Sequence, residues 1–199
     1  MNNQTYFLQL RTALNSYSFI SDETFEEFKN FCYLKKVKKG ENLLLLGDKA
    51  KFIHFICKGL LRTYFLDEKA NTYNKNLFCE NFFSASVVSL LTEENSYLCI
   101  EALEDSIVID IDFKEYKALI NKKEDLKNFY IKYIEKNWII EKEKVEISFA
   151  VDDATKRYLN FIKKYPNIEN RVAQHHIASH LGITPTQLSR IRKSMNICK

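Results

Sequence analysis

The sequence predicts an α+β protein: an antiparallel β-roll with flanking helices, then a long helix, then a C-terminal helix-turn-helix domain. Between residues 33 and 111, turn signals such as Lys39-Gly40 and Gly47-Asp48 recur about every seven to eleven residues, which is typical of short antiparallel strands. Residues 123–150 form the longest helical pattern, without Gly or Pro. Two short helical patterns follow around Gly182. We therefore expect a β-roll domain at 1–122, a long helix at 123–150 and a helix-turn-helix domain at 151–199.

The N-terminal domain is expected to begin with helices over residues 1–31, the second of them starting at Ser21. Strands are then predicted at Leu43–Leu46, Phe52–Cys57 and Leu60–Leu66. A short helix is expected within Phe82–Leu91, and closing strands are expected at Leu98–Leu103 and Ile107–Ile111. A further helix is expected at Phe113–Leu119, after Asp112. Such spacing fits a rolled sheet better than an α/β fold.

The long helix carries apolar residues on two sides. One stripe contains Leu126, Phe129, Tyr133, Ile140 and Ile147, and the other contains Ile131, Ile134, Trp138, Val145 and Phe149. A helix that is apolar on two sides must be buried on two sides. The roll can cover one side, and the simplest cover for the other is the same helix of a second copy, so we expect a homodimer. The alternative is one thick helix inside a monomer.

The helix-turn-helix is predicted from local signals. Gly182 stands where a helix ends in a left-handed conformation. Thr184 can cap the second helix, Pro185 occupies its first position, and Gln187 completes a capping box. The inward stripe is Leu188, Ile191 and Met195; the residues expected to contact DNA are Thr184, Thr186, Gln187, Ser189, Arg190, Arg192 and Lys193. Before the helix-turn-helix, Asp152-Asp153 should cap a further helix over Ala154–Tyr165.

Charge supports DNA as the partner. Residues 154–199 contain nine Lys or Arg and one acid, Glu169, whereas residues 1–153 contain 21 basic and 25 acidic residues. A basic end on a mildly acidic chain is typical of a module that binds phosphate. Within the helix, we expect Arg190 to contact a guanine, and Lys193, Arg192 and Lys199 to contact phosphates.

The order of strand roll, long helix and helix-turn-helix resembles the Crp/Fnr family of bacterial transcription regulators over nearly the whole chain. The matching motifs are Lys39-Gly40-Glu41, Gly47-Asp48, Phe55-Ile-Cys-Lys-Gly59, Ile100-Glu-Ala-Leu-Glu-Asp105 and Lys156-Arg157-Tyr158-Leu159. The resemblance implies a cyclic-nucleotide-binding-like roll, a homodimer that binds double-stranded DNA, and contact with RNA polymerase.

Two positions depart from the pocket that this resemblance implies. Cys79-Glu80 stands where the family has Gly-Glu, and Ser96-Tyr97 stands near its Arg-Ser/Thr pair. The ligand pocket is therefore expected at Glu80, Ser96 and Tyr97, without the arginine that would hold a phosphate. We expect no cAMP binding and no cofactor; the pocket is either kept as architecture only or takes another ligand.

The DNA-binding end also departs from the family. Pro185 stands where many members have a base-reading arginine, while Arg190 matches a second arginine position. We further expect most of the β-hairpin wing to be missing, because the chain ends four residues after Met195.

Other function classes find less support in the sequence. The roll offers only His54 for a cupin-type metal site, and His176 and His180 lack the glutamate of the metalloprotease pattern, so neither an enzyme nor a metal site is expected. The five cysteines are scattered, which predicts reduced thiols in a cytoplasmic protein and no haem or iron–sulfur sensor. No signal peptide or membrane segment is expected. The alternative that stays open is a ligand-binding sensor that acts through a protein partner rather than DNA.

Overall fold

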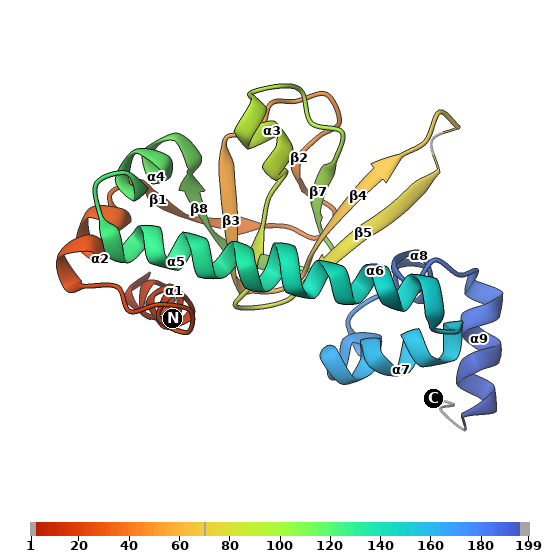
Figure 1. The fold of residues 1–199 in the computed structure, drawn as a ribbon. Coiled ribbons are helices and arrows are strands. Elements are labelled where there is room, and N and C mark those ends of the chain that lie inside the picture. The colour runs from red at the N-terminus through yellow and green to blue at the C-terminus, as the bar shows by residue number, and fades with distance from the viewer. Residues whose placement is uncertain (1–2, 70, 196–199) are drawn as a thin grey trace.

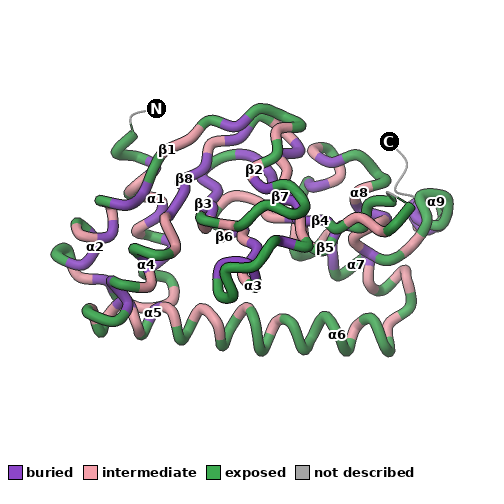
Figure 2. The backbone as a smooth tube through the Cα atoms, turned by 90° about the horizontal axis from the view of Figure 1, so that it is seen from above, coloured by how far each residue is buried: buried purple, intermediate pink, exposed green. Residues whose placement is uncertain are grey.

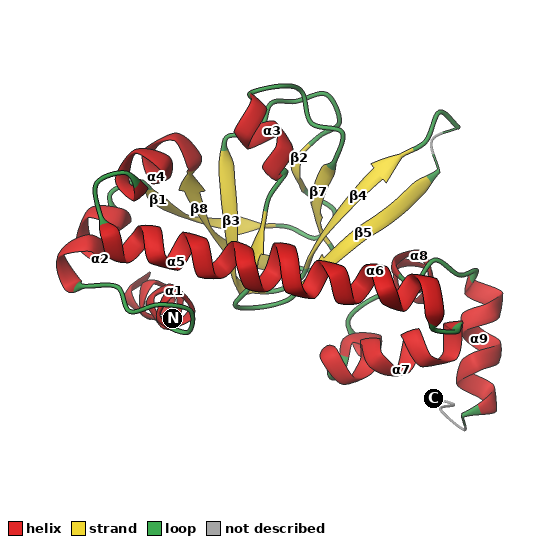
Figure 3. Ribbon diagram, in the orientation of Figure 1, coloured by secondary structure: helices red, strands yellow, loops and turns green. Residues whose placement is uncertain are grey.

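The computed structural model describes residues 3–69 and 71–195, and it confirms the predicted α+β architecture. The β-roll with its N-terminal helices lies at one end of the molecule (Figure 1). One long helix runs beneath the roll to the opposite end, where the last helices gather (Figure 3). Within the described ranges, no helix is both long and apolar enough to cross a membrane.

The N-terminal helices form as predicted and close one end of the roll. They are α1 (Asn3–Asn15) and α2 (Asp22–Lys29). Ser21 caps α2, its hydroxyl accepting a hydrogen bond from the Thr24 amide at 3.2 Å. Asp125 ties this corner to the long helix, because its carboxylate accepts from the Ser21 amide and from the Thr24 hydroxyl, both at 2.9 Å.

The roll consists of two four-stranded antiparallel sheets. One sheet has the order β1 (Cys32–Val37), β8 (Ser106–Asp112), β3 (Phe52–Lys58) and β6 (Phe83–Ser84). The other has the order β2 (Asn42–Leu44), β7 (Cys99–Ala102), β4 (Leu61–Leu66) and β5 (Thr72–Phe78). A core that includes Val37, Ile56, Leu61, Ile100 and Val108 is shared by the two sheets. The predicted strands are confirmed within a few residues. Strands β1, β5 and β6 have no predicted counterpart, and the sequence of β5 is mostly polar.

Two short helices accompany the roll. One is α3 (Val87–Thr92), within the predicted region, and the other is α4 (Phe113–Ile120), capped by Asp112 as predicted. The Asp112 carboxylate accepts from the Glu115 amide at 3.1 Å.

The long helix is continuous but not uniform. It comprises α5 (Glu124–Ile134), a π-helical segment (Glu135–Ile140) and α6 (Glu141–Val151). Leu126 and Phe129 of α5 are buried, whereas no residue from Glu135 to Val151 is buried. Figure 2 shows this change, with α6 drawn entirely as exposed or intermediate. Both buried residues belong to one of the two predicted stripes, and the stripe of Ile131, Ile134, Trp138, Val145 and Phe149 has no buried member. The expected burial on two sides is therefore not realised within one copy.

The C-terminal segment forms a compact helical unit with α7 (Ala154–Lys164), a short 3₁₀ helix (Ile168–Asn170), α8 (Gln174–His180) and α9 (Pro185–Ser194). Asp153 caps α7, accepting from the Lys156 amide at 2.8 Å. The apolar cluster of this unit also includes Leu60, Leu77 and Leu103 of the roll. The unit therefore packs on the roll rather than standing apart from it.

Candidate nucleic-acid interface

The last two helices form the predicted helix-turn-helix, and its turn is specified by backbone hydrogen bonds. Gly182 adopts a left-handed conformation with φ +66°. The Ile183 amide donates to the Ala178 carbonyl at 3.0 Å and the Gly182 amide to the Ser179 carbonyl at 3.2 Å, which together form a Schellman motif. The Thr184 hydroxyl then caps α9 by accepting from the Gln187 amide at 3.1 Å. The tight turn and the capped start together fix the direction of α9 relative to α8.

The face of α9 that was predicted to contact DNA is open to solvent. Leu188 and Ile191 point inward and are buried, as expected from their spacing. The predicted contact residues that are exposed are Thr184, Thr186, Gln187, Arg190 and Lys193, while Ser189 is half-buried. Within the described residues, neither Arg190 nor Lys193 forms an ion pair with a carboxylate. Hydroxyl, amide and cationic groups are thus displayed on one face, and these groups can reach base edges and phosphates.

Arg192 corrects the prediction, because the structure places it inside the domain. Its side chain is 8% exposed, and its Nε lies 3.1 Å from Oε1 of Glu169. The same carboxylate oxygen accepts a hydrogen bond from the Tyr158 hydroxyl at 2.6 Å. Burial, followed by this contact with Glu169, raises the pKa of Tyr158. Arg192 therefore joins α9 to the rest of the domain and does not face outward with Arg190. Lys199 and Cys198 lie outside the described residues, as does the segment on which the expected absence of a wing depends.

The structure does not bring the three predicted pocket residues together. Tyr97 is 75% exposed and, with Ser96, lines an open hollow of about 670 Å³. Ser96 itself is buried, and its hydroxyl contacts the Ser86 hydroxyl at 2.7 Å. Glu80 does not line this hollow; its carboxylate accepts from the Gly59 amide at 2.9 Å and from Arg171. The grouping of Glu80 with Ser96 and Tyr97 is therefore corrected.

Glu80 instead takes part in a contact between the roll and the C-terminal unit. Arg171 donates to both oxygens of Glu80, at 3.0 and 2.8 Å, and its Nη2 also contacts Glu104. Burial alone would raise the pKa of Glu80, but the hydrogen bonds from Arg171 and from backbone amides outweigh it, and the pKa is lowered. The guanidinium thus holds two carboxylates of the roll from a position just before α8.

A second polar contact joins α8 to the β4–β5 hairpin. Arg62 donates to Glu101 at 2.9 and 2.6 Å and to Asn74 Oδ1 at 3.0 Å, and its Nη1 lies 3.2 Å from His176 Nδ1. Asn74 completes the contact, with its amide side chain donating to the His176 carbonyl at 2.9 Å and its backbone amide donating to the Ser179 hydroxyl at 2.9 Å. Figure 1 shows α8 at the base of this hairpin. The first helix of the helix-turn-helix is therefore docked on the roll.

Sequence reasoning did not identify Arg62, Asn74 or Arg171. A signal for Arg62 was present, because a charged residue inside the apolar strand Leu61–Leu66 needs a partner in the fold. No local signal marks Asn74 or Arg171, whose partners lie about a hundred residues away along the chain.

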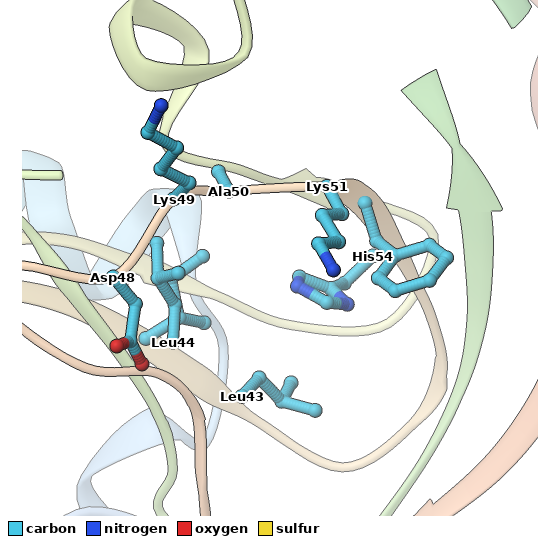
Figure 4. A pocket seen from close by; sticks show the side chains of 9 residues that line it. Leu43, Leu44, Asp48, Lys49, Ala50, Lys51 and His54 are labelled. Carbon is cyan, nitrogen blue, oxygen red and sulfur yellow. The ribbon is translucent and has the colours of Figure 1, made fainter. Parts of the chain in front are cut away.

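A hollow of about 400 Å³ with mixed polar and apolar walls opens beside β3 (Figure 4). His54 lines it, with its ring lying below the side chain of Lys51, while Lys49 points away (Figure 4). The His54 side chain is otherwise buried, and its Nδ1 lies 2.6 Å from Asp110 Oδ1. Among the described residues, no group of three or more His, Cys, Asp or Glu side chains is placed to hold a metal ion.

Comparison with known proteins yields a fold but no sequence family. No family model matches the chain, and no curated protein matches it. The structure of FixK2 from Bradyrhizobium japonicum is similar with a TM-score of 0.70 and 13% identity, over 83% of this chain and 85% of that one. The c-di-GMP-responsive global regulator CLP of Xanthomonas campestris is similar with a TM-score of 0.67 and 13% identity, over 89% and 92%.

A third similar structure, cAMP-bound PfPKA-R, matches a smaller part of the molecule. Its TM-score is 0.53 with 20% identity, over 62% of this chain, which spans 46% of that chain. These structural neighbours show that the fold is of the cyclic-nucleotide-binding-domain type, built on antiparallel sheets.

The docked helix α8 generates a prediction about pH. Burial, followed by the charge of Arg62, lowers the pKa of His176 to about 4, and burial lowers the pKa of His180 to about 4 as well. An unfolded chain binds these protons near pH 6.5, so the folded state loses stability as pH falls from about 6.5 towards 4. We expect the thermal unfolding midpoint to fall between pH 7 and pH 5, and His176→Gln to make that fall smaller.

The exposed neighbour His175 provides the matched control. His175→Gln should keep the pH dependence of the unmodified protein, measured by circular dichroism at both pH values. An equal fall in the midpoint for His176→Gln and the unmodified protein would show that protonation of His176 does not oppose folding.

Proposed function

We propose that the protein is a sequence-specific DNA-binding transcription regulator of the Crp/Fnr type, acting as a homodimer and not as an enzyme. The observation that carries this proposal is the exposed face of α9, whose start is capped by Thr184 and on which Arg190 and Lys193 form no ion pair with any described residue. The basic composition of residues 154–199 supports it, since nine Lys or Arg there meet one acid. The structural neighbour CLP is described as a global regulator linked to gene expression, which supports the same function. RNA polymerase would then be a partner, and the cytoplasm the site of action.

The unburied half of the long helix supports a dimer. Ile140, Ile147 and Val151 recur at helical spacing and are 49–73% exposed. A helix in water gains most of its stability from packing one apolar face, and this face has no partner within one copy. Phe149, on the other stripe, lies near Gly182 of the helix-turn-helix, so that stripe is partly used within the chain. We therefore assign the stripe of Ile140, Ile147 and Val151 to contact with a second copy.

Several contacts argue against cAMP as the effector. Glu80, the carboxylate expected to accept from a ribose hydroxyl, is already held by Arg171. Ser96-Tyr97 supplies no cation to a phosphate, and an unpaired phosphate inside a protein is strongly unfavourable. We propose that the roll keeps the architecture of a cyclic-nucleotide-binding domain but takes another ligand.

Recognition of DNA is tested by separating base contacts from phosphate contacts. A bidentate Arg–guanine contact contributes about 1–3 kcal/mol of base discrimination, so Arg190→Ala should weaken a selected duplex about ten- to a hundredfold and a scrambled duplex far less. Lys193→Ala should weaken both duplexes alike and lower the salt dependence by about one phosphate contact. Both effects are measured by fluorescence anisotropy over a series of salt concentrations.

Lys114→Ala is the control, because it removes an exposed lysine from α4, at the opposite end of the molecule from α9 (Figure 1). It should leave binding to both duplexes unchanged. Equal losses on the two duplexes for Arg190→Ala would mean that Arg190 contacts only the backbone. If the unmodified protein binds neither duplex, the alternative of a sensor that acts through a protein partner replaces the proposal.

Dimerisation is tested on the exposed stripe. Ile147→Glu places a charge where we expect contact with the second copy, so sedimentation velocity should show the dimer of the unmodified protein shifted to monomer. Asn128→Glu introduces the same charge at an exposed polar position of α5 and should leave the dimer intact. A monomer at micromolar concentration for the unmodified protein would contradict the dimer.

A further inference from the structure

A third cavity, separate from the hollows beside His54 and Tyr97, lies where the roll meets the long helix. Its volume is about 230 Å³, and its walls come from α1, α2, α3, α4, β3, β6, β8 and the long helix. The residues that line it include Phe83, Val87, Tyr116, Tyr133, Ile134 and Trp138. No Lys, Arg, Asp, Glu or His lines it. The cavity is therefore uncharged on all sides.

Three features of the walls limit what can occupy this space. The walls are rich in aromatic rings, and Phe83 and Tyr133 pack edge to face with 5.4 Å between their centroids. Tyr116 is only 5% exposed, and among the described residues its hydroxyl and that of Tyr133 form no hydrogen bond. Neither hydroxyl is a fully buried unpaired group, but each can donate a hydrogen bond to a ligand that offers one polar acceptor.

The volume sets the size of the ligand. An apolar cavity of about 150 Å³ holds benzene, so this one corresponds to roughly eight to twelve non-hydrogen atoms. An anion is unsuited to it, because no cation lines the walls to offset desolvation. No histidine or cysteine is present to ligate a haem iron.

We propose that this cavity is the effector site, and that it binds a small uncharged alicyclic or aromatic molecule carrying one hydroxyl or carbonyl group. As an effector site it rests on the proposed function, whereas binding itself does not.

The position of the cavity connects it to the rest of the molecule. Ile134 and Trp138 line it. Ile134 directly precedes the π-helical segment Glu135–Ile140, and Trp138 lies within that segment. A π-helical turn contains an extra residue, and such turns are frequent at functional sites. If a ligand beside Trp138 converts this turn to an α-helix, α6 rotates by about 100°, one residue of an α-helix. That rotation would move both the stripe of Ile140 and Ile147 and the Phe149 ring beside Gly182.

The test uses 1-adamantanol, an uncharged alicyclic alcohol that is transparent where tryptophan absorbs. Trp138 is the single tryptophan of the chain and lines the cavity, so its emission reports occupancy directly. We expect saturable binding with a stoichiometry of one per chain, a change in Trp138 emission, and at least tenfold weaker binding of 1-adamantanecarboxylate. Calorimetry on the full chain provides the stoichiometry independently.

A pair of neighbouring valines provides the variants. Val87→Phe fills the cavity and should weaken 1-adamantanol binding at least tenfold, whereas Val88→Phe changes an exposed residue outside the cavity and should not. Circular dichroism confirms that both variants are folded; if Val87→Phe is not, the carboxylate comparison on the unmodified protein decides alone. Unchanged emission and no heat, or equal affinity for alcohol and carboxylate, would overturn the proposal.

Two further results separate this site from its rivals. Binding seen only below the concentration at which the dimer dissociates would mean that a second copy occupies the cavity, and would also overturn the proposal. A change of at least fivefold in duplex affinity when 1-adamantanol is bound supports the effector role. If binding is confirmed but the protein binds no duplex, the proposed function fails while the ligand site stands.

Discussion

The position of the C-terminal helical unit depends on two arginines that cross from one part of the chain to another. Arg62 of the roll reaches Asn74 and His176, and Arg171 reaches back to Glu80 and Glu104. The side chains of Arg171, Glu80 and Glu104 are about 30% exposed, and an ion pair that is open to water contributes little net stability. These contacts therefore specify geometry more than stability: they determine where α8 lies, and through the Gly182 turn, where α9 points.

The long helix relates this arrangement to the rest of the molecule. Its first half is covered by aromatic side chains of the roll, including Tyr17 and Phe83 around Tyr133. Its second half has no buried residue, yet it passes the turn of the helix-turn-helix at Phe149. Between the halves lies the π-helical segment, beside an apolar cavity. The roll, the exposed stripe of α6 and the C-terminal helical unit thus share one helix, and a local change of its winding would reach all three.

The features that the sequence predicted well are those determined by neighbouring residues. Caps at Ser21, Asp112, Asp153 and Thr184 lie where expected, because a cap needs only its own first turn. Features set by distant partners were missed or misassigned. Helical spacing alone could not show that Arg192 meets Glu169, or that Glu80 meets an arginine ninety-one positions away. Strand β5 was missed because its sequence is mostly polar, and some of those polar groups contact α8. The π-helical segment was missed because its sequence pattern does not differ from that of an α-helix.

The central claim is that two copies of α9 read DNA as a symmetric pair, and selection of duplexes from a random pool tests it most directly. The full-length protein, incubated with a pool of random duplexes, retains those that it binds, and the retained sequences are compared after several rounds. The account predicts an enriched inverted repeat, with half-sites about one helical turn apart, since a two-fold dimer reads a two-fold site. No enrichment, or enrichment of a single unrepeated site, would contradict it.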